Sequence, residues 1–247
     1  ENDYLYTSFV KPVAYSMDGY YFLKFNLAYA AIHPLTQEEF LTKYPFLVVF
    51  HEKGELIEFR FDVLKRVFLS DKKEPTIYSN LIAEMSDYFK EHFECDLIPL
   101  NLDFMVNVCK RDENVKLIAQ SMKLPNGGNA QLDVGNNQEY ILPFIGELRS
   151  LLNDNQAELE KVPDFREALE QFMLEMGEMS DYPWIELLWE NEIKTRSNRV
   201  KFVFNYMNKS YCLIQYYYSN VLIGMERMNY VIEYIVNHRN DDTTQNE

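Results

Sequence analysis

Hydrophobic and polar residues alternate along the first third of the chain. Between residues 20 and 30, every second position is apolar. A period of two predicts a β-strand with one buried face. Asp18-Gly19 comes just before this segment and favours a tight hairpin turn. An aromatic segment at 4–10 is the expected partner strand.

A second hairpin is predicted at residues 46–51 and 55–62, with Glu52-Lys53-Gly54 as a three-residue loop. Apolar residues at odd positions of the second strand alternate with charged residues at even positions. The two hairpins therefore predict an antiparallel sheet with one solvated face. A short helix is expected between them at 36–44, because Thr36 favours a helix start and two glutamates follow it.

The middle of the chain has a mixed pattern. Apolar residues recur every four positions from Ile77 to Phe93, which predicts a helix over 76–93. Residues 103–110 resemble a strand, and 115–122 fit either a helix or a strand. A helical pattern returns over 139–152.

The last third shows three seams of apolar residues spaced three and four apart, at 162–179, 185–207 and 211–235. This spacing predicts three long helices, and the third seam is long enough for coiled-coil-like packing. A β-hairpin at 200–206 and 211–217 is the alternative, because aromatic and β-branched residues are frequent there.

These elements predict an α+β fold. It consists of an N-terminal antiparallel sheet with hairpins and one or two helices, followed by a C-terminal bundle of about three long helices. Composition changes near Asn153, so we expect a mixed domain at 1–153, an acidic helical interaction domain at 154–240 and a frayed tail at 241–247. The two domains are allowed to share one core.

Charge narrows the classes of partner. The net charge is −15, and residues 154–194 hold three basic and twelve acidic residues, a local charge of −9. Such a surface repels nucleic acids and anionic lipids and attracts a basic protein. The simpler alternative is that the charge only maintains solubility. No segment has the ~20 apolar residues of a membrane span, and three separated cysteines favour a reducing, cytoplasmic setting.

Motifs for catalysis and metal binding are absent from the sequence. The four histidines are scattered, so no metal site and no cofactor are expected. His51 is interpreted as a solvated histidine at a strand end. Glu58 and Asp62 share a strand face and are weak candidates for paired catalytic carboxylates. Arg60, which lies between them, is the simpler explanation as an ion-pair partner.

The preferred hypothesis is a non-enzymatic interaction protein, such as a scaffold, an inhibitor or immunity-type protein, or an assembly subunit. Its expected partner is a basic protein, and homo-oligomers are possible. The predicted contact residues lie on the acidic helical face and on a Tyr/Met-rich helix: Glu167, Glu170, Glu175, Glu178, Tyr216, Tyr217 and Tyr218. The alternatives are a nuclease-like hydrolase with dispersed carboxylates, and a nucleic-acid-associated subunit that uses the basic residues at 194–201. Nucleic-acid and membrane binding are not expected.

Overall fold

The computed structural model describes residues 11–17, 19–32, 35–51, 56–64, 76–123, 128–133, 148, 151–178, 181–190, 197–217 and 225–239. The chain divides into two compact units, Glu1–Ile98 and Pro99–Glu247, so the boundary expected at residue 153 lies within the second unit. Most of the regular structure is β: a four-stranded antiparallel sheet in the first unit and a five-stranded antiparallel sheet in the second.

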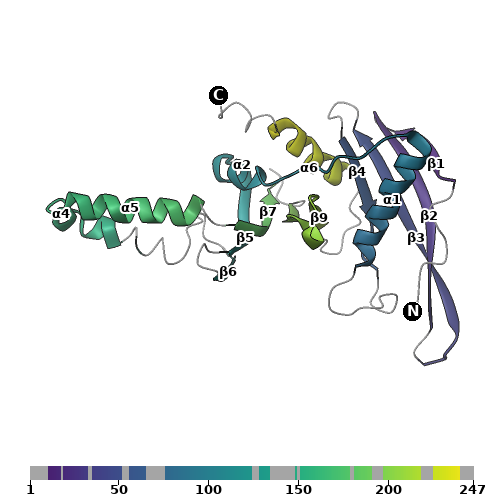
Figure 1. Ribbon diagram of the computed structural model, residues 1–247, viewed down its shortest axis with the longest axis horizontal. Helices are drawn as coiled ribbons and strands as arrows, with labels where there is room; N and C mark the ends of the chain where they lie inside the picture. The colour runs from purple at the N-terminus through teal and green to yellow at the C-terminus, as the bar shows by residue number, and fades with distance from the viewer. Residues whose placement is uncertain are drawn as a thin grey trace. The chain divides into compact units, whose positions relative to one another are not determined.

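The first sheet is a meander of β1 (Val13–Met17), β2 (Tyr20–Ile32), β3 (Glu39–His51) and β4 (Leu56–Phe61), in that order (Figure 1). The turn predicted at Gly19 is confirmed, and its φ of +81° is one that glycine adopts without strain. The strand before this turn is β1, while residues 4–10 lie outside the described part of the chain.

The helix predicted at 36–44 is wrong. Strand β3 begins at Glu39 and pairs with β2 from Ile32↔Glu39 to Tyr21↔Phe50. Phe40, Thr42 and Tyr44 are more buried than the residues between them, so this segment has the period of a strand. The threonine and glutamates that resembled a helix start lie in and beside the turn that joins β2 and β3.

Helix α1 (Ile77–Phe93) packs on one face of the first sheet and confirms the helix predicted at 76–93. Leu81, Met85 and Phe89, spaced by four, are at most 2% exposed. They meet the inward residues of β2 and β3 in one hydrophobic cluster that includes Phe25, Leu27, Tyr29, Tyr44, Phe46 and Val48. Burial of this helix face is the main stabilisation that holds α1 on the sheet.

The second sheet has the strand order β6 (Asn129–Asp133), β5 (Val115–Lys123), β7 (Asp181–Trp189), β8 (Asn198–Val203) and β9 (Leu213–Tyr216). Helix α6 (Met225–His238) packs on this sheet, where Trp189 contacts the ring of Tyr234 edge-on. Asn198 Nδ2 donates a hydrogen bond to the Arg227 carbonyl oxygen at 3.1 Å. The Tyr234 hydroxyl donates to Asp112 Oδ2 at 2.6 Å, which fixes α6 to the loop before β5.

Residues 103–110 do not form the predicted strand. They belong largely to helix α2 (Met105–Arg111), in which Met105 and Cys109, four residues apart, are both buried. The Asn101 side chain accepts a hydrogen bond from the Asp103 backbone N–H at 2.8 Å and so supports the turn that leads into this helix. The segment that fitted either structure, 115–122, is strand β5.

The predicted C-terminal bundle of three long helices is also wrong, and the described residues show no coiled-coil packing. Residues 181–189 form β7, while β8 and β9 form the hairpin that the sequence offered as the alternative. A short 3-10 turn, η3 (Tyr206–Asn208), connects them, with positive φ at Asn205, Met207 and Asn208. Of the predicted helices, α5 (Pro163–Glu178) and the later part of the third, α6, are helical.

Helix α4 (Gln156–Leu159) comes just before α5 and packs against it. Within the described part of the chain, no helix has the length and apolar character needed to cross a membrane.

Candidate protein-binding interface

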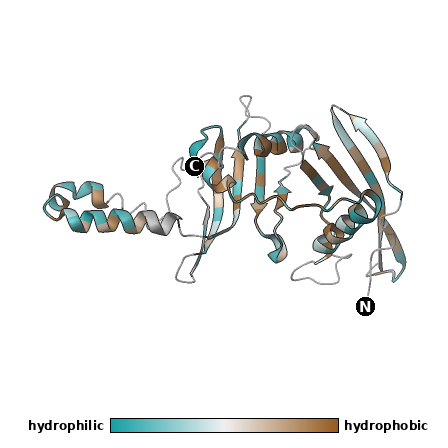
Figure 2. Ribbon diagram, turned by 45° about the horizontal axis from the view of Figure 1, so that its top comes forward, coloured by the Kyte–Doolittle hydropathy of each residue, from teal (hydrophilic) through white to brown (hydrophobic). Residues whose placement is uncertain are grey.

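Helix α5 is amphipathic by its own sequence. Pro163 and Asp164 suit its first turn, because proline lacks the N–H that would stay unpaired there and an acid interacts well with the helix dipole. Phe165, Leu169 and Phe172 follow at spacings of four and three, so they lie on one face. Bands of hydrophobic and hydrophilic residues run along the helix in Figure 2.

The apolar face of α5 is largely exposed. Phe165 is 57% exposed and Phe172 is 46% exposed, while Leu169 is half-buried and Met173 is buried. Val162, just before the helix, is 49% exposed. Large rings exposed side by side on one helix face are typical of a surface that another molecule covers.

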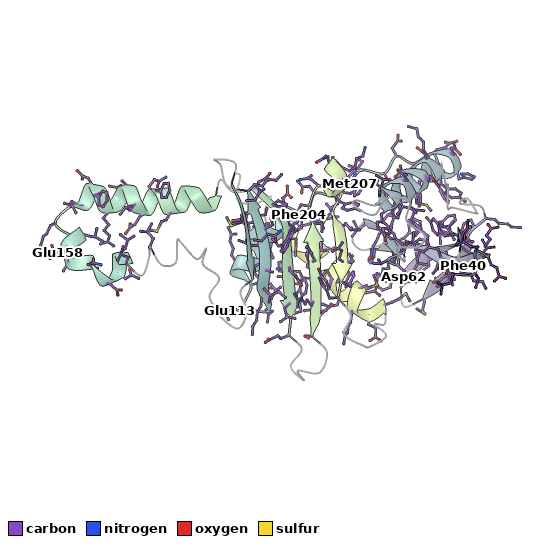
Figure 3. All side chains as sticks on the ribbon, turned by 90° about the horizontal axis from the view of Figure 1, so that it is seen from below. Phe40, Asp62, Glu113, Glu158, Phe204 and Met207 are labelled. Atoms are coloured by element: carbon purple, nitrogen blue, oxygen red, sulfur yellow. The ribbon has the colours of Figure 1, made fainter. Side chains whose placement is uncertain are left out.

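The opposite side of α5 is acidic. The helix contains five acidic residues and one basic residue, Arg166. Arg166 Nε donates to Glu170 Oε1 at 2.8 Å, which leaves Asp164 and Glu167 exposed without an ion pair among the described residues. The nearby Glu158, labelled on α4 in Figure 3, pairs with Lys161. Predicted contact residues Glu167 and Glu170 therefore do lie at the surface.

Glu175 and Glu178 also belong to α5, but their side chains lie outside the described part of the structure. Their backbone positions lie within about two helical turns after Glu170. Their role in binding stays a prediction.

The tyrosines at 216–218 do not lie on a helix. Tyr216 is the last residue of β9 and is half-buried, whereas Tyr217 is 44% exposed just after the strand. The Tyr217 N–H donates to the Arg199 carbonyl oxygen, and the Arg199 guanidinium lies over the Tyr217 ring at 5.3 Å from its centre. Tyr218 is outside the described residues. Because a strand turns successive side chains to opposite faces, the described pair Tyr216 and Tyr217 does not form one patch.

The basic residues at 199 and 201 are engaged within the second sheet. Arg199 forms an ion pair with Glu186, a residue of β7 that is 5% exposed. The Lys201 ammonium lies 3.7 Å from the centre of the Trp184 ring, and burial lowers the pKa of this lysine. These contacts account for both cations without a nucleic acid. Lys194 and Arg196 lie outside the described residues.

Glu58 lies in a buried ionic cluster. Its Oε2 atom is 2.9 Å from His51 Nε2 and accepts a hydrogen bond from the Arg60 guanidinium at 2.8 Å. Burial favours the neutral acid, but the His51 hydrogen bond and the Arg60 charge outweigh it and hold the pKa of Glu58 below its usual value. The Arg60 ion pair expected as the simpler explanation is thus confirmed.

Two other candidate residues, His51 at the end of β3 and Asp62 just after β4, are also placed by the structure. His51 is 5% exposed, so its interpretation as a solvated residue is wrong. Asp62 follows the end of β4, where its carbonyl oxygen accepts a hydrogen bond from the Tyr44 hydroxyl at 2.6 Å. A catalytic role for Glu58 and Asp62 stays a prediction.

Among the described residues, no group of three or more metal-ligating side chains is close enough to hold an ion. The spacing of Phe165 and Phe172 predicts that they share one helix face, but this face was expected to be buried in a bundle. Nothing in the sequence pattern indicated that it is exposed.

No family model, no curated protein and no solved structure matches this chain.

Proposed function

We propose that this protein acts by binding another protein, and that the acidic, aromatic helix α5 is the docking element. The observation that carries the proposal is the exposure of Phe165 and Phe172, at 57% and 46%, on one face of a helix whose other face is acidic. The described residues of this chain leave about half of each side chain exposed.

The partner segment that fits is a basic amphipathic helix. Its apolar face would cover the two rings, and burial of a phenylalanine side chain contributes about 1.5–3 kcal/mol. Its lysines or arginines would be attracted by Asp164 and Glu167, which are exposed on the acidic side of α5. The charge of −9 over residues 154–194 would attract such a segment from a distance and speed its association.

The setting of this interaction is proposed to be the cytoplasm. The structure has no disulfide that involves Cys95, Cys109 or Cys212, which supports a reducing compartment.

The test uses the full chain and a fluorescent peptide in which Lys and Leu alternate with helical spacing. Anisotropy measures its binding, with a Glu/Leu peptide of the same pattern as the negative control. We expect binding of the basic peptide alone, and weaker binding as salt rises, because salt screens exposed charges. The double variant Phe165→Ala/Phe172→Ala should weaken binding by roughly tenfold or more. Phe93→Ala is the matched control, since Phe93 is 52% exposed on α1.

Two further double variants test whether binding depends on the position of the acidic residues or only on the net charge of the protein. Asp164→Lys/Glu167→Lys should weaken binding far more than Glu113→Lys/Glu226→Lys, although both variants change the net charge equally. Glu113 and Glu226 are exposed and lie outside α5. Equal effects of the two double variants, or of Phe93→Ala and the α5 aromatic variant, would show that α5 is not the docking element.

A further inference from the structure

Strand β1 is the outermost strand of the first sheet (Figure 1). It pairs with β2 from Val13↔Lys24 to Met17↔Tyr20, and within the described residues no strand pairs with its outer side. All five of its residues are exposed. A strand edge of this kind presents backbone N–H and C=O groups that can pair with a strand of another chain.

The edge of β1 lacks the features that commonly protect an edge strand. Such strands often contain a charged residue, a proline or a bulge. The sequence of β1 is Val-Ala-Tyr-Ser-Met, and its register with β2 is regular throughout. Val13, Tyr15 and Met17 alternate, so they share one face, and they are 55%, 38% and 43% exposed. The strand that fits this edge is therefore uncharged and apolar at alternate positions.

Strand β1 has this pattern itself, so a second copy of the chain matches the edge. In an antiparallel pair centred on Tyr15, each Val13 is opposite Met17 of the other copy, and the two Tyr15 residues are opposite each other. The Tyr15 ring already stacks on Phe22, with ring centres 4.9 Å apart. The pair would thus extend an aromatic row across both sheets, and a cross-strand aromatic pair contributes roughly 0.2–1 kcal/mol.

The limits of β1 select this register. Pro12, just before the strand, has no N–H to donate, and the turn at Gly19 ends the strand on the other side. Only the register centred on Tyr15 pairs all five residues of one copy with all five of the other. A shift of one residue opposes the apolar positions of one copy to Ala14 and Ser16 of the other. A shift of two leaves two of the five strand residues without a partner.

Charge selects the antiparallel orientation. Lys24 is the β2 partner of Val13, and both Lys24 and Lys11 are exposed. A parallel pair of two copies would place the lysines of both copies at the same end of the interface, where like charges are destabilising. The antiparallel pair places them at opposite ends.

We propose that a second copy of this chain pairs antiparallel with the outer edge of β1, with a twofold axis at Tyr15. The two four-stranded sheets then form one continuous sheet, in the order β4-β3-β2-β1-β1-β2-β3-β4. Five residues from each chain form a small interface, so the dimer is expected to be weak and in exchange with the monomer. This interface belongs to the first unit and does not use α5, so it stands or falls separately from the proposed function.

Disulfide trapping tests the register directly. In a Cys95→Ser background, which removes the exposed native thiol, an equimolar mixture of Val13→Cys and Met17→Cys chains should form a cross-linked dimer under mild oxidation. Each variant alone is the matched control. In the proposed register its own copy is about 14 Å away, at ~3.4 Å per residue over four residues, beyond the reach of a disulfide. No cross-linking in the mixture, or equal cross-linking of either variant alone, would overturn the proposal.

Introduced charges test the same pairs without cysteines. Sedimentation equilibrium of the full chain over roughly 1–300 µM should show a monomer–dimer equilibrium. The variant Val13→Lys/Met17→Lys should weaken it by roughly tenfold or more, because it places two lysines opposite each other twice. The matched variant Val13→Lys/Met17→Glu places lysine opposite glutamate twice and should keep the dimer.

The two charge variants also separate this pairing from general repulsion between two acidic chains. The net charge of the protein is −15, so the variant with two added lysines is the less acidic one and would dimerise better if net charge alone decided. The proposed pairing predicts the opposite order. A monomer at all concentrations, or equal dimerisation of the two variants, would refute a second copy as the occupant and leave the edge to another protein.

Discussion

Replacing Glu58 by glutamine should destabilise the first unit by about 3 kcal/mol at neutral pH. Glu58 Oε2 contacts both His51 and Arg60 at 2.9 and 2.8 Å, and the exposed fractions of the three side chains are 5–12%. Removing one charge of a buried ion pair costs about 3–5 kcal/mol, because the other charge stays buried. The amide keeps the shape of the side chain and one acceptor oxygen, so the lower end of that range applies.

The destabilisation caused by Glu58→Gln should decrease as the pH falls. The pKa of Glu58 is held below its ordinary value of 4.5 in the folded protein. A carboxyl with a lowered folded pKa stabilises the protein fully above its unfolded pKa and loses this contribution as pH falls through the folded pKa. The difference between wild type and Glu58→Gln should therefore be largest near pH 7 and should shrink below the unfolded pKa.

Urea unfolding followed by far-ultraviolet circular dichroism measures the loss, and hydrogen exchange of β3 and β4 peptides assigns it to the first unit. The control is Asp96→Asn, which removes an exposed ion pair with Lys90 whose side chains are 69% and 79% exposed. Such a pair contributes about 1 kcal/mol or less. A loss below 1 kcal/mol for Glu58→Gln, or one that does not change with pH, would refute the buried-pair argument. A large loss also means that inactivity of this variant in any enzymatic assay says nothing about catalysis.

Two further predictions concern the second unit and the thiols. Tyr234→Phe removes the hydrogen bond to the Asp112 carboxylate and should lower the free energy of unfolding by about 1.5 kcal/mol, measured by urea unfolding with Trp fluorescence. The control Tyr230→Phe, at a residue that is 48% exposed, should lower it by less than about 0.5 kcal/mol. Cys95 is exposed, Cys109 is buried and burial raises the pKa of Cys212, so a thiol reagent such as DTNB should modify Cys95 first. The other two thiols should react only after unfolding; rapid reaction of all three would contradict the burial described here.

The sequence predicted elements well where every position of a segment agreed with one period. In α1, Leu81, Met85 and Phe89 are buried and the residues between them are more exposed, so the period of a helix was unambiguous. Strand β4 shows a strict alternation that admits no helix. Local pattern and burial agree in α1. In β4 the alternation correctly predicted a strand, although the charged Arg60 is buried and the apolar residues are only partly buried.

The predicted bundle failed because a spacing of four residues fits two structures. Ile185 and Trp189 share a face in a helix and also in a strand, since four is a multiple of two. The residues between them decide the question: Leu187 is fully buried with them, and Glu186 points to the other face, where it pairs with Arg199. Burial of a glutamate beside a cross-strand arginine is tertiary information that spacing does not contain.

The ionic cluster of His51, Glu58 and Arg60 was not predicted, because the predicted register between β3 and β4 is wrong by one residue. The predicted three-residue loop places His51 opposite residue 55, and Glu58 then lies on the other face of the sheet from His51. The observed pairs are His51↔Leu56 and Val49↔Glu58, so His51 and Glu58 share a face. A slip of one residue exchanges the two faces of a strand, and a histidine expected in water becomes buried against a carboxylate.

The wrong prediction of a C-terminal bundle also changes the interpretation of helix α5. Its apolar face was predicted correctly, as was its acidic side, but the neighbouring helices that were expected to cover Phe165 and Phe172 are strands of the second sheet. An amphipathic helix gains most of its stability from the surface that covers its apolar face. The described chain buries Met173 and leaves both rings about half exposed. Under the proposed function, a partner helix would supply the missing cover, and the acidic side of α5 would favour a basic helix.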